Sequence, residues 1–234
     1  MSDSWLRFWD RPHKIYVNDR HLRVHYARIA DEILAILPDR AGLQVLDFGC
    51  GEALDAARVA QRVARLYLHD GAPSVRAHLA ERFAGTANIA VLDDAGLAAL
   101  ADGSLDVIIV FSVIQYVGRL ALPGLLRQWR RKLAPDGVLV VADVIPPNAR
   151  MLDDIHALLA TAWHHGFFLA ALGGLALTLF SDYRRLRQSL GLAVYTEDEM
   201  RRLLHDAAFT VESLPRNLGF HRARRTYVAR PISG

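Results

Sequence analysis

Val45-Leu46-Asp47-Phe48-Gly49-Cys50-Gly51 holds the strongest structural signal in the chain. An apolar run ends in an acidic residue and passes at once into two glycines, and a helix-like segment follows at 54–63. This order predicts a buried strand, a tight turn and the N-terminus of a helix. Glycine accepts positive φ and lets the backbone approach a ligand, and a helix N-terminus offers free N–H groups to anions. The turn is therefore a predicted binding loop for a nucleotide-like ligand, although a glycine pair alone also fits an ordinary tight turn.

Strand-like and helix-like segments alternate along the chain. Strands are predicted at 44–47, 65–69, 89–92, 105–111, 138–144, 210–214 and 226–229, and helices at 20–37, 54–63, 73–84, 119–133 and 196–208. The last helix opens with Thr196 three residues before Glu199, the pattern of a capping box. Alternation of this kind predicts an α/β fold with a doubly wound, mostly parallel sheet. We expect one domain over 1–234, with an irregular stretch at 1–20 inside an N-terminal helical segment, 1–40.

The composition limits the classes of function. The 234 residues carry a net charge of +3, with 52% hydrophobic residues, which fits one globular domain and gives no argument for nucleic acid. A single cysteine, Cys50, excludes an internal disulfide and fits a reducing compartment. The first ten residues lack the apolar region of a signal peptide. We therefore expect a cytoplasmic protein.

Polar residues follow the predicted strands where ligands bind in open α/β sheets. Asp70 ends the second strand, where a carboxylate can accept both hydroxyls of a ribose, and Asp94-Ala95 follows the third. Phe111-Ser112 follows the fourth. Each aspartate also fits a helix cap or a turn. The fingerprint of dinucleotide-binding folds is incomplete, because its third glycine position is Leu54, which disfavours an NAD-dependent oxidoreductase.

Together these motifs resemble the class I, Rossmann-like, S-adenosylmethionine-dependent methyltransferases. The resemblance covers about 40–145 and 195–230 and includes Asp47 to Ala53 and the run from Leu133 through Pro135-Asp136-Gly137 to Val140. It implies a seven-stranded sheet whose last strand is antiparallel, and S-adenosylmethionine as cofactor with S-adenosylhomocysteine as product. The cofactor-binding residues that it implies are Asp47, Gly49, Cys50, Gly51, Asp70, Asp94, Ala95, Phe111 and Ser112. The family's third loop glycine is Ala53 here, so the backbone at this position should avoid strongly positive φ.

An apolar insertion, 146–194, separates the fifth and sixth predicted strands. Its middle, 157–180, is long and apolar enough to span a membrane, but a single crossing would place two strands of one sheet on opposite sides of the bilayer. We expect a helical lid over the site. Contact with a second copy of the chain in a homodimer and contact with a membrane surface remain open.

An apolar lid favours a small apolar, aromatic or lipid-like acceptor, methylated on oxygen or carbon. Residues that we expect to act as a base or to position the acceptor are His13, Tyr16, His164 and His165, and those expected to contact it are Gln115, Tyr116, Tyr183 and His221. All of them also fit ordinary packed or surface positions. Asp153-Asp154-x-His156 fits helix N-terminal charges better than metal ligands, so no metal is expected.

Two alternatives to a small-molecule methyltransferase stay open. The first is a methyltransferase-like module that binds the cofactor for assembly or regulation and has no catalytic activity. The second, less favoured, is an NAD-dependent oxidoreductase on a similar sheet. RNA methylation would need a broad basic face or a stacking motif beside the site, and the sequence shows neither clearly.

Overall fold

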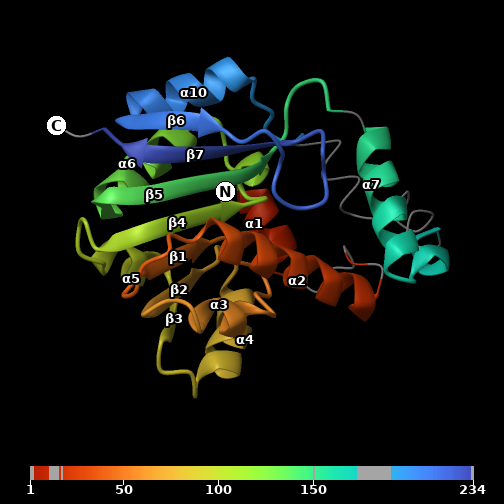
Figure 1. Cartoon of the computed structure of the whole chain (residues 1–234), viewed down its shortest axis with the longest axis horizontal. Coiled ribbons are helices and arrows are strands. Elements are labelled where there is room, and N and C mark those ends of the chain that lie inside the picture. Colours follow the sequence, from red (N-terminus) through yellow and green to blue (C-terminus); the bar gives the residue numbers. More distant parts are fainter. Residues whose placement is uncertain (1–2, 11–15, 17, 150, 173–190, 233–234) are drawn as a thin grey trace.

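The computed structural model describes residues 3–10, 16, 18–149, 151–172 and 191–232. Its strands form one seven-stranded sheet in the order β3-β2-β1-β4-β5-β7-β6 (Figure 1). Only β7 runs antiparallel to its neighbours β5 and β6. The strands are β1 Gln44–Phe48, β2 Arg65–His69, β3 Ile89–Leu92, β4 Leu105–Phe111, β5 Leu133–Val144, β6 Phe209–Ser213 and β7 Arg225–Pro231. The predicted α/β sheet with an antiparallel last strand is confirmed.

Helices cover both faces of this sheet (Figure 1). One face carries α2 (Asp19–Ile36), α3 (Ala56–Ala60) and α4 (Pro73–Phe83), and the other carries α5 (Asp94–Ala99), α6 (Leu122–Lys132) and α10 (Glu197–Asp206). Successive strand residues alternate between the two cores, as the pleat requires, so that the neighbours Val45 and Leu46 are both fully buried in different clusters. The parallel strands all end at one edge, where loops from both faces meet.

Three elements differ from the sequence-based expectation. The stretch expected to be irregular contains helix α1 (Asp3–Trp9), whose buried Trp5 packs against Tyr116 with ring centroids 4.7 Å apart. Helix α5 was not expected, and it begins because the Asp93 side chain accepts a hydrogen bond from the Gly96 N–H at 2.7 Å. Strand β5 begins at Leu133 and not near residue 138, because Leu133 pairs with Leu105 before the register shifts.

The capping box expected at Thr196 is present. The Thr196 hydroxyl accepts from the Glu199 N–H at 3.1 Å, and the Glu199 carboxylate accepts from the Thr196 N–H at 2.8 Å. Two of the free donors at the start of α10 are therefore satisfied by side chains.

Helix α7 (Met151–His164) lies in the insertion between β5 and β6 and stands beyond the carboxyl edge of the sheet (Figure 1). Trp163 and Leu169 are strongly exposed there, at 70% and 83%. Among the residues that the structure describes, no helix combines the length and apolar character needed to cross a membrane. Residues 173–190, which include Tyr183, and residues 11–15, which include His13, lie outside the described part of the chain.

Candidate active site

The loop after β1 depends on its glycines because neighbouring side chains press against it. Gly49 and Gly51 have φ of +75° and +57°. A Cβ on Gly49 would lie 2.3 Å from Cγ2 of Val113, and one on Gly51 would lie 2.5 Å from the Tyr26 hydroxyl oxygen. The chain itself therefore excludes larger residues at both positions. Ala53 has φ of +41°, which lies in the left-handed region, whereas the sequence led us to expect that this residue avoids strongly positive φ.

Hydrogen bonds from three directions fix this loop. The N–H groups of Gly49 and Cys50 both donate to the carbonyl of His69, at 2.7 and 3.1 Å. The N–H of Glu52 donates to the Tyr26 hydroxyl at 2.8 Å. The loop is thus tied to β2 on one side and to α2 on the other, and Tyr26 is a contributor that the sequence alone did not indicate.

Asp70 closes the third side of the loop. Its Oδ2 accepts from the Gly51 N–H at 3.1 Å and its Oδ1 accepts from the Ala72 N–H at 2.8 Å, at the start of α4. The residue is 8% exposed. Burial raises the pKa of Asp70, and the two backbone N–H groups oppose this rise. The structure places Asp70 where a ribose-binding carboxylate is expected, and it also shows the turn contacts of the alternative interpretation.

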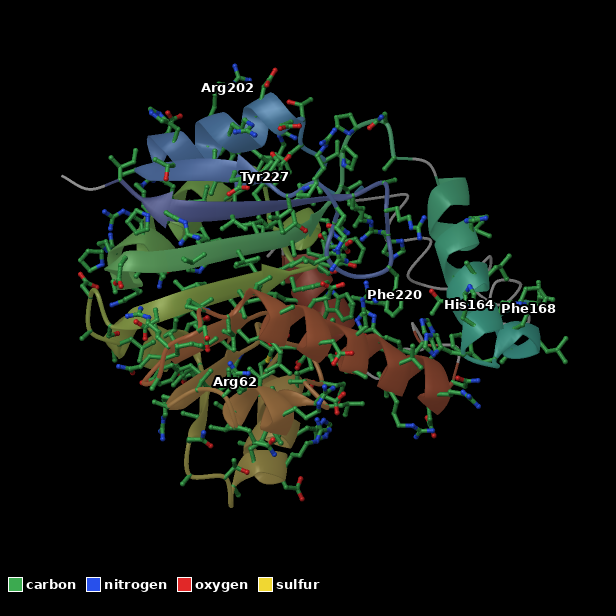
Figure 2. The ribbon with its side chains drawn as sticks, viewed as in Figure 1. Arg62, His164, Phe168, Arg202, Phe220 and Tyr227 are labelled. Carbon is green, nitrogen blue, oxygen red and sulfur yellow. The ribbon has the colours of Figure 1, made fainter. Side chains whose placement is uncertain are left out.

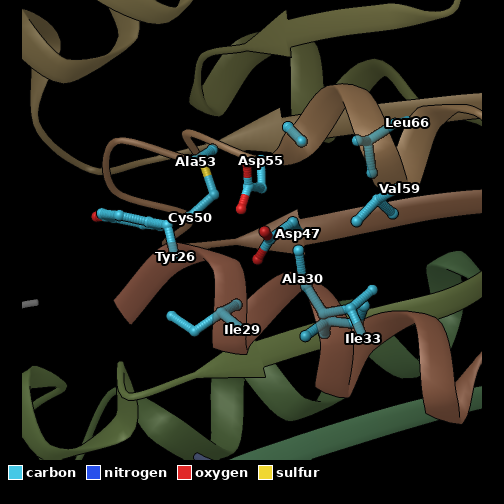
Figure 3. Close-up of a pocket in the computed structure, with 12 residues that line it drawn as sticks. Tyr26, Ile29, Ala30, Ile33, Asp47, Cys50, Ala53, Asp55, Val59 and Leu66 are labelled. Carbon is cyan, nitrogen blue, oxygen red and sulfur yellow. The ribbon is translucent and has the colours of Figure 1, made fainter. Parts of the chain in front are cut away.

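Asp47 lies beneath the same loop, between α2 and α3 (Figure 3). It borders a cavity of about 20 Å³, room for about one water molecule, together with Tyr26, Cys50 and Ala53. Burial, and then the nearby Asp70, raise the pKa of Asp47 to about 7. Burial also raises the pKa of the Cys50 thiol well above its usual value, so Cys50 stays protonated and is a poor nucleophile.

Asp94 and Ala95 form the first turn of α5, beside the end of β2. Asp94 Oδ1 lies 2.9 Å from His69 Nε2, while the Asp94 side chain is 90% exposed. His69 is buried and stacks on Phe48, with centroids 4.6 Å apart. Asp94 therefore presents an accessible carboxylate at the sheet edge, where an adenine-binding residue is expected.

Phe111 and Ser112 end β4 at a buried polar network. Ser112 has φ of +58°, and its hydroxyl donates to Asp143 Oδ2 at 2.6 Å. Asp143, at +65°, also accepts from Arg224 Nη1 at 2.5 Å and from Asn217 Nδ2 at 2.9 Å. The sequence analysis did not identify Asp143, because it is a single polar residue within the apolar run of a strand. Its partners come from the β6–β7 loop, 74 and 81 residues further along the chain.

The residues expected to position or to contact the acceptor lie in different surroundings. Gln115 is buried in the short helix η1 (Ile114–Tyr116), and its Nε2 donates to the Ser112 carbonyl at 2.8 Å. Tyr116 packs against α1. Tyr16 lies 3.4 Å from the Tyr26 hydroxyl, and burial raises the pKa of Tyr16 to about 12. Tyr16 is therefore protonated at neutral pH, which disfavours it as a general base.

Helix α2 adds two histidines that the sequence did not single out. Burial, and then the nearby His21, lower the pKa of His25 to about 4, so its imidazole is neutral at physiological pH. The ring of His25 stacks with Phe220 of the β6–β7 loop at 6.2 Å, and that of His21 stacks with Phe167 at 5.2 Å. Through these ring contacts, α2 packs against the β6–β7 loop and against the segment that follows α7.

A cavity of about 970 Å³ lies between α7 and the β6–β7 loop, in the size range of small-molecule sites. Figure 2 shows His164 on the α7 side and Phe220 on the loop side. This cavity is lined by His164 and His165, which were expected to act as a base or to position the acceptor, and by His221, which was expected to contact it. In the part of the chain that the structure covers, no three His, Cys, Asp or Glu side chains come together as metal ligands.

Comparisons with known proteins agree with this architecture. A family model described as "Methyltransferase domain" matches residues 19–214. A search of curated proteins finds no match.

Many solved structures share the fold. A chain in the complex between the Haloferax volcanii Trm112 methyltransferase activator and the putative methyltransferase is 18% identical, with a TM-score of 0.57, and the match covers 99% of this chain and 96% of that one. Magnesium protoporphyrin IX methyltransferase (ChlM) from Synechocystis PCC 6803, with bound SAH, is 19% identical, with a TM-score of 0.56 and coverage of 97% and 91%. CurJ carbon methyltransferase is 18% identical, with a TM-score of 0.56, and the match covers 90% of this chain but only 55% of that chain.

Proposed function

Because the chain belongs to the family of methyltransferase domains, we propose that it transfers a methyl group from S-adenosylmethionine to a small organic acceptor. The single observation that carries the proposal is the pair of buried carboxylates, Asp47 and Asp70, at the glycine loop of a domain that matches this family. We expect the acceptor to be methylated on oxygen or carbon and to present an apolar or aromatic body.

The residues at the loop fit this cofactor. Burial raises the pKa of both Asp47 and Asp70, and for Asp70 two backbone N–H groups oppose this rise. S-adenosylmethionine carries two positive groups, an ammonium and a sulfonium. Burial disfavours the ionised form of these carboxylates, and a positively charged ligand beside them would stabilise that form.

Each of the residues at this edge of the sheet has an expected role in binding the cofactor. Asp70 would hold the ribose hydroxyls, Asp94 with Ala95 would meet the adenine, and the backbone of Phe111 and Ser112 would face the methionine end. Asp47 would support the loop. The strand and helix contacts that fix the loop limit the motion of these groups before binding, which lowers the ordering cost.

The cofactor supplies an electrophilic methyl group for in-line displacement. The protein's part is to align the acceptor and to exclude water, which accounts for a large share of the rate in such reactions. His25 stacks on Phe220 of the β6–β7 loop, and its pKa of about 4 makes it a weak proton acceptor at physiological pH. The candidate bases among the described residues are therefore His164 and His165.

Calorimetric titration with S-adenosylmethionine, S-adenosylhomocysteine and NAD tests the proposal directly. We expect micromolar binding of the first two and none of NAD. Asp70→Ala should weaken binding by 10- to 100-fold, since charge-assisted hydrogen bonds contribute about 1.5–3 kcal/mol. Asp39→Ala is the matched control, because the Asp39 side chain is fully exposed on the surface.

Thermal unfolding of the same variants separates binding from folding. Asp70→Ala removes two acceptors for backbone N–H groups, so a lower Tm is expected for that variant alone. Unchanged affinity in folded Asp70→Ala would remove the ribose assignment. Binding of NAD would favour the oxidoreductase, and binding of S-adenosylmethionine without turnover of any acceptor would favour the non-catalytic module.

A further inference from the structure

The cavity between α7 and the β6–β7 loop is strongly basic. The described residues that line it include four arginines and four histidines, and none of these described residues is an aspartate or glutamate. They are Arg28, Arg216, Arg222, Arg224, His156, His164, His165 and His221. The charge of the whole chain is only +3, so this concentration is a local property of the cavity and not of the composition.

Carboxylates behind the wall neutralise part of this charge. Glu32, which is buried on α2, pairs with Arg28 at 2.6 Å and accepts two hydrogen bonds from Arg216 at 3.0 and 3.1 Å. Asp143 pairs with Arg224. Within the described residues, two carboxylates thus pair with three of the four guanidinium groups.

Two donors on the wall remain open to a ligand. Arg222 is exposed and takes part in no ion pair with a described residue. Arg28 binds Glu32 through Nη2 at 2.6 Å, yet its side chain is 42% exposed on the cavity wall, so part of its guanidinium group can face a ligand. A guanidinium group that is only partly paired fits a carboxylate or phosphate, which accepts charge-assisted hydrogen bonds from it.

The cavity adjoins the expected site of methyl transfer. Gly219, on its wall, packs so closely on Phe111 that an added Cβ would lie 3.0 Å from the ring. Asn217 and Arg224, also on the wall, bind Asp143, which in turn holds Ser112. A molecule in the cavity therefore lies one layer of side chains from the end of β4.

The geometry points to an acceptor that carries an oxyanion, a carboxylate or a phosphate, held by Arg222 and Arg28 in this cavity. Apolar wall residues such as Phe220, Ala160 and Pro215 leave room for an uncharged body beside the anionic group. This inference rests on the proposed function, and it refines the expected apolar acceptor to one with an apolar body and an acidic group.

Binding of simple probes in the absence of cofactor tests the inference. We would titrate the full chain with phenyl phosphate, benzoate and benzamide, where benzamide is the neutral counterpart of benzoate. The two anions should bind at least 10-fold more tightly than benzamide, and more weakly at high salt. Arg222→Gln should weaken anion binding 3- to 10-fold. Arg202→Gln is the matched control, because Arg202 lies on α10, away from the cavity (Figure 2).

The outcomes are distinct from those of the cofactor experiment. Equal binding of benzamide and benzoate, no binding of either anion, or an Arg222→Gln variant with unchanged anion affinity would overturn the inference while leaving cofactor binding intact. Flotation with phosphatidylglycerol vesicles distinguishes a membrane-borne phosphate. Capture on vesicles without binding of the soluble anions would contradict a small-molecule acceptor. Failure of S-adenosylmethionine to bind, with anion binding retained, would remove the proposed function instead.

Discussion

The surroundings of Asp47 disfavour the ionised form of its carboxylate. Its pKa rises from the usual 3.8 to about 7, mainly because it is buried and secondly because Asp70 is near. As pH rises from about 4, the unfolded chain loses this proton before the folded protein does. The free energy of unfolding therefore falls between pH 4 and 7 and levels off above that range.

Asp47→Asn removes this penalty while keeping the shape of the side chain. At pH 8 the variant should be more stable than the parent protein by an amount on the order of 1–4 kcal/mol, and near pH 4 the two should have similar stability. Urea unfolding at both pH values measures the difference. An effect of equal size at pH 4 and pH 8 would show that the charge of Asp47 is not its cause.

The sequence predicted the residues of the glycine loop well because their requirements are local. A strand, two glycines with positive φ and the following helix are encoded in a continuous run, and so is the position of Asp70 at the end of its strand. The other half of the environment is not local. Tyr26 binds the loop from 26 residues away, and its own helix gave no sign of that contact.

Helix α2 holds the glycine loop after β1 in place. The Tyr26 hydroxyl accepts from Glu52 and lies against Gly51, while Glu32, two turns further along, binds Arg216 of the β6–β7 loop. One helix thus contacts both the expected cofactor site and the basic cavity. Its capping residue Asn18, which accepts from the His21 N–H, fixes where the helix begins.

Tyr26→Phe tests this bracing. The change removes one hydrogen bond to the loop and keeps the packed ring, so we expect about 1 kcal/mol of lost stability. Because the loop becomes less ordered, affinity for S-adenosylmethionine should fall about 3- to 10-fold. Tyr67→Phe is the matched control: the Tyr67 hydroxyl donates to Gln44, well away from the loop. Equal loss of affinity in both variants would contradict a specific role for α2.

At the scale of the whole molecule, the seven strands could be predicted, but the contacts between the loops at the edge of the sheet could not. Apolar runs and turn residues located the strands, the resemblance implied that the last one is antiparallel, and the structure supplied their order. Helix α5 was missed because it is only six residues long. The basic cavity was missed because Arg28 and Arg216 come from opposite ends of the chain, and only the tertiary structure brings them to one wall.

Asp143 is the point at which these distant segments join. It links Ser112 at the end of β4 with Asn217 and Arg224 in the β6–β7 loop, and it is almost fully buried. Asp143→Asn keeps a residue type that tolerates the left-handed backbone, here at φ of +65°, so the change mainly removes the charge opposite Arg224.

We expect Asp143→Asn to lower the free energy of unfolding by about 2–4 kcal/mol, because a buried ion pair loses one partner. For a chain of this size each kcal/mol corresponds to about 2–4 °C in Tm, so calorimetry should show a fall of roughly 5–15 °C. Asp102→Asn is the control, since its pair with Lys132 lies at the opposite edge of the sheet and the Asp102 side chain is mostly exposed. If both variants lose equally little stability, the Asp143 network does not hold the β6–β7 loop to the sheet. If Asp143→Asn alone unfolds at a lower temperature, the network is what fixes the wall of the basic cavity against the strands that carry the expected cofactor site.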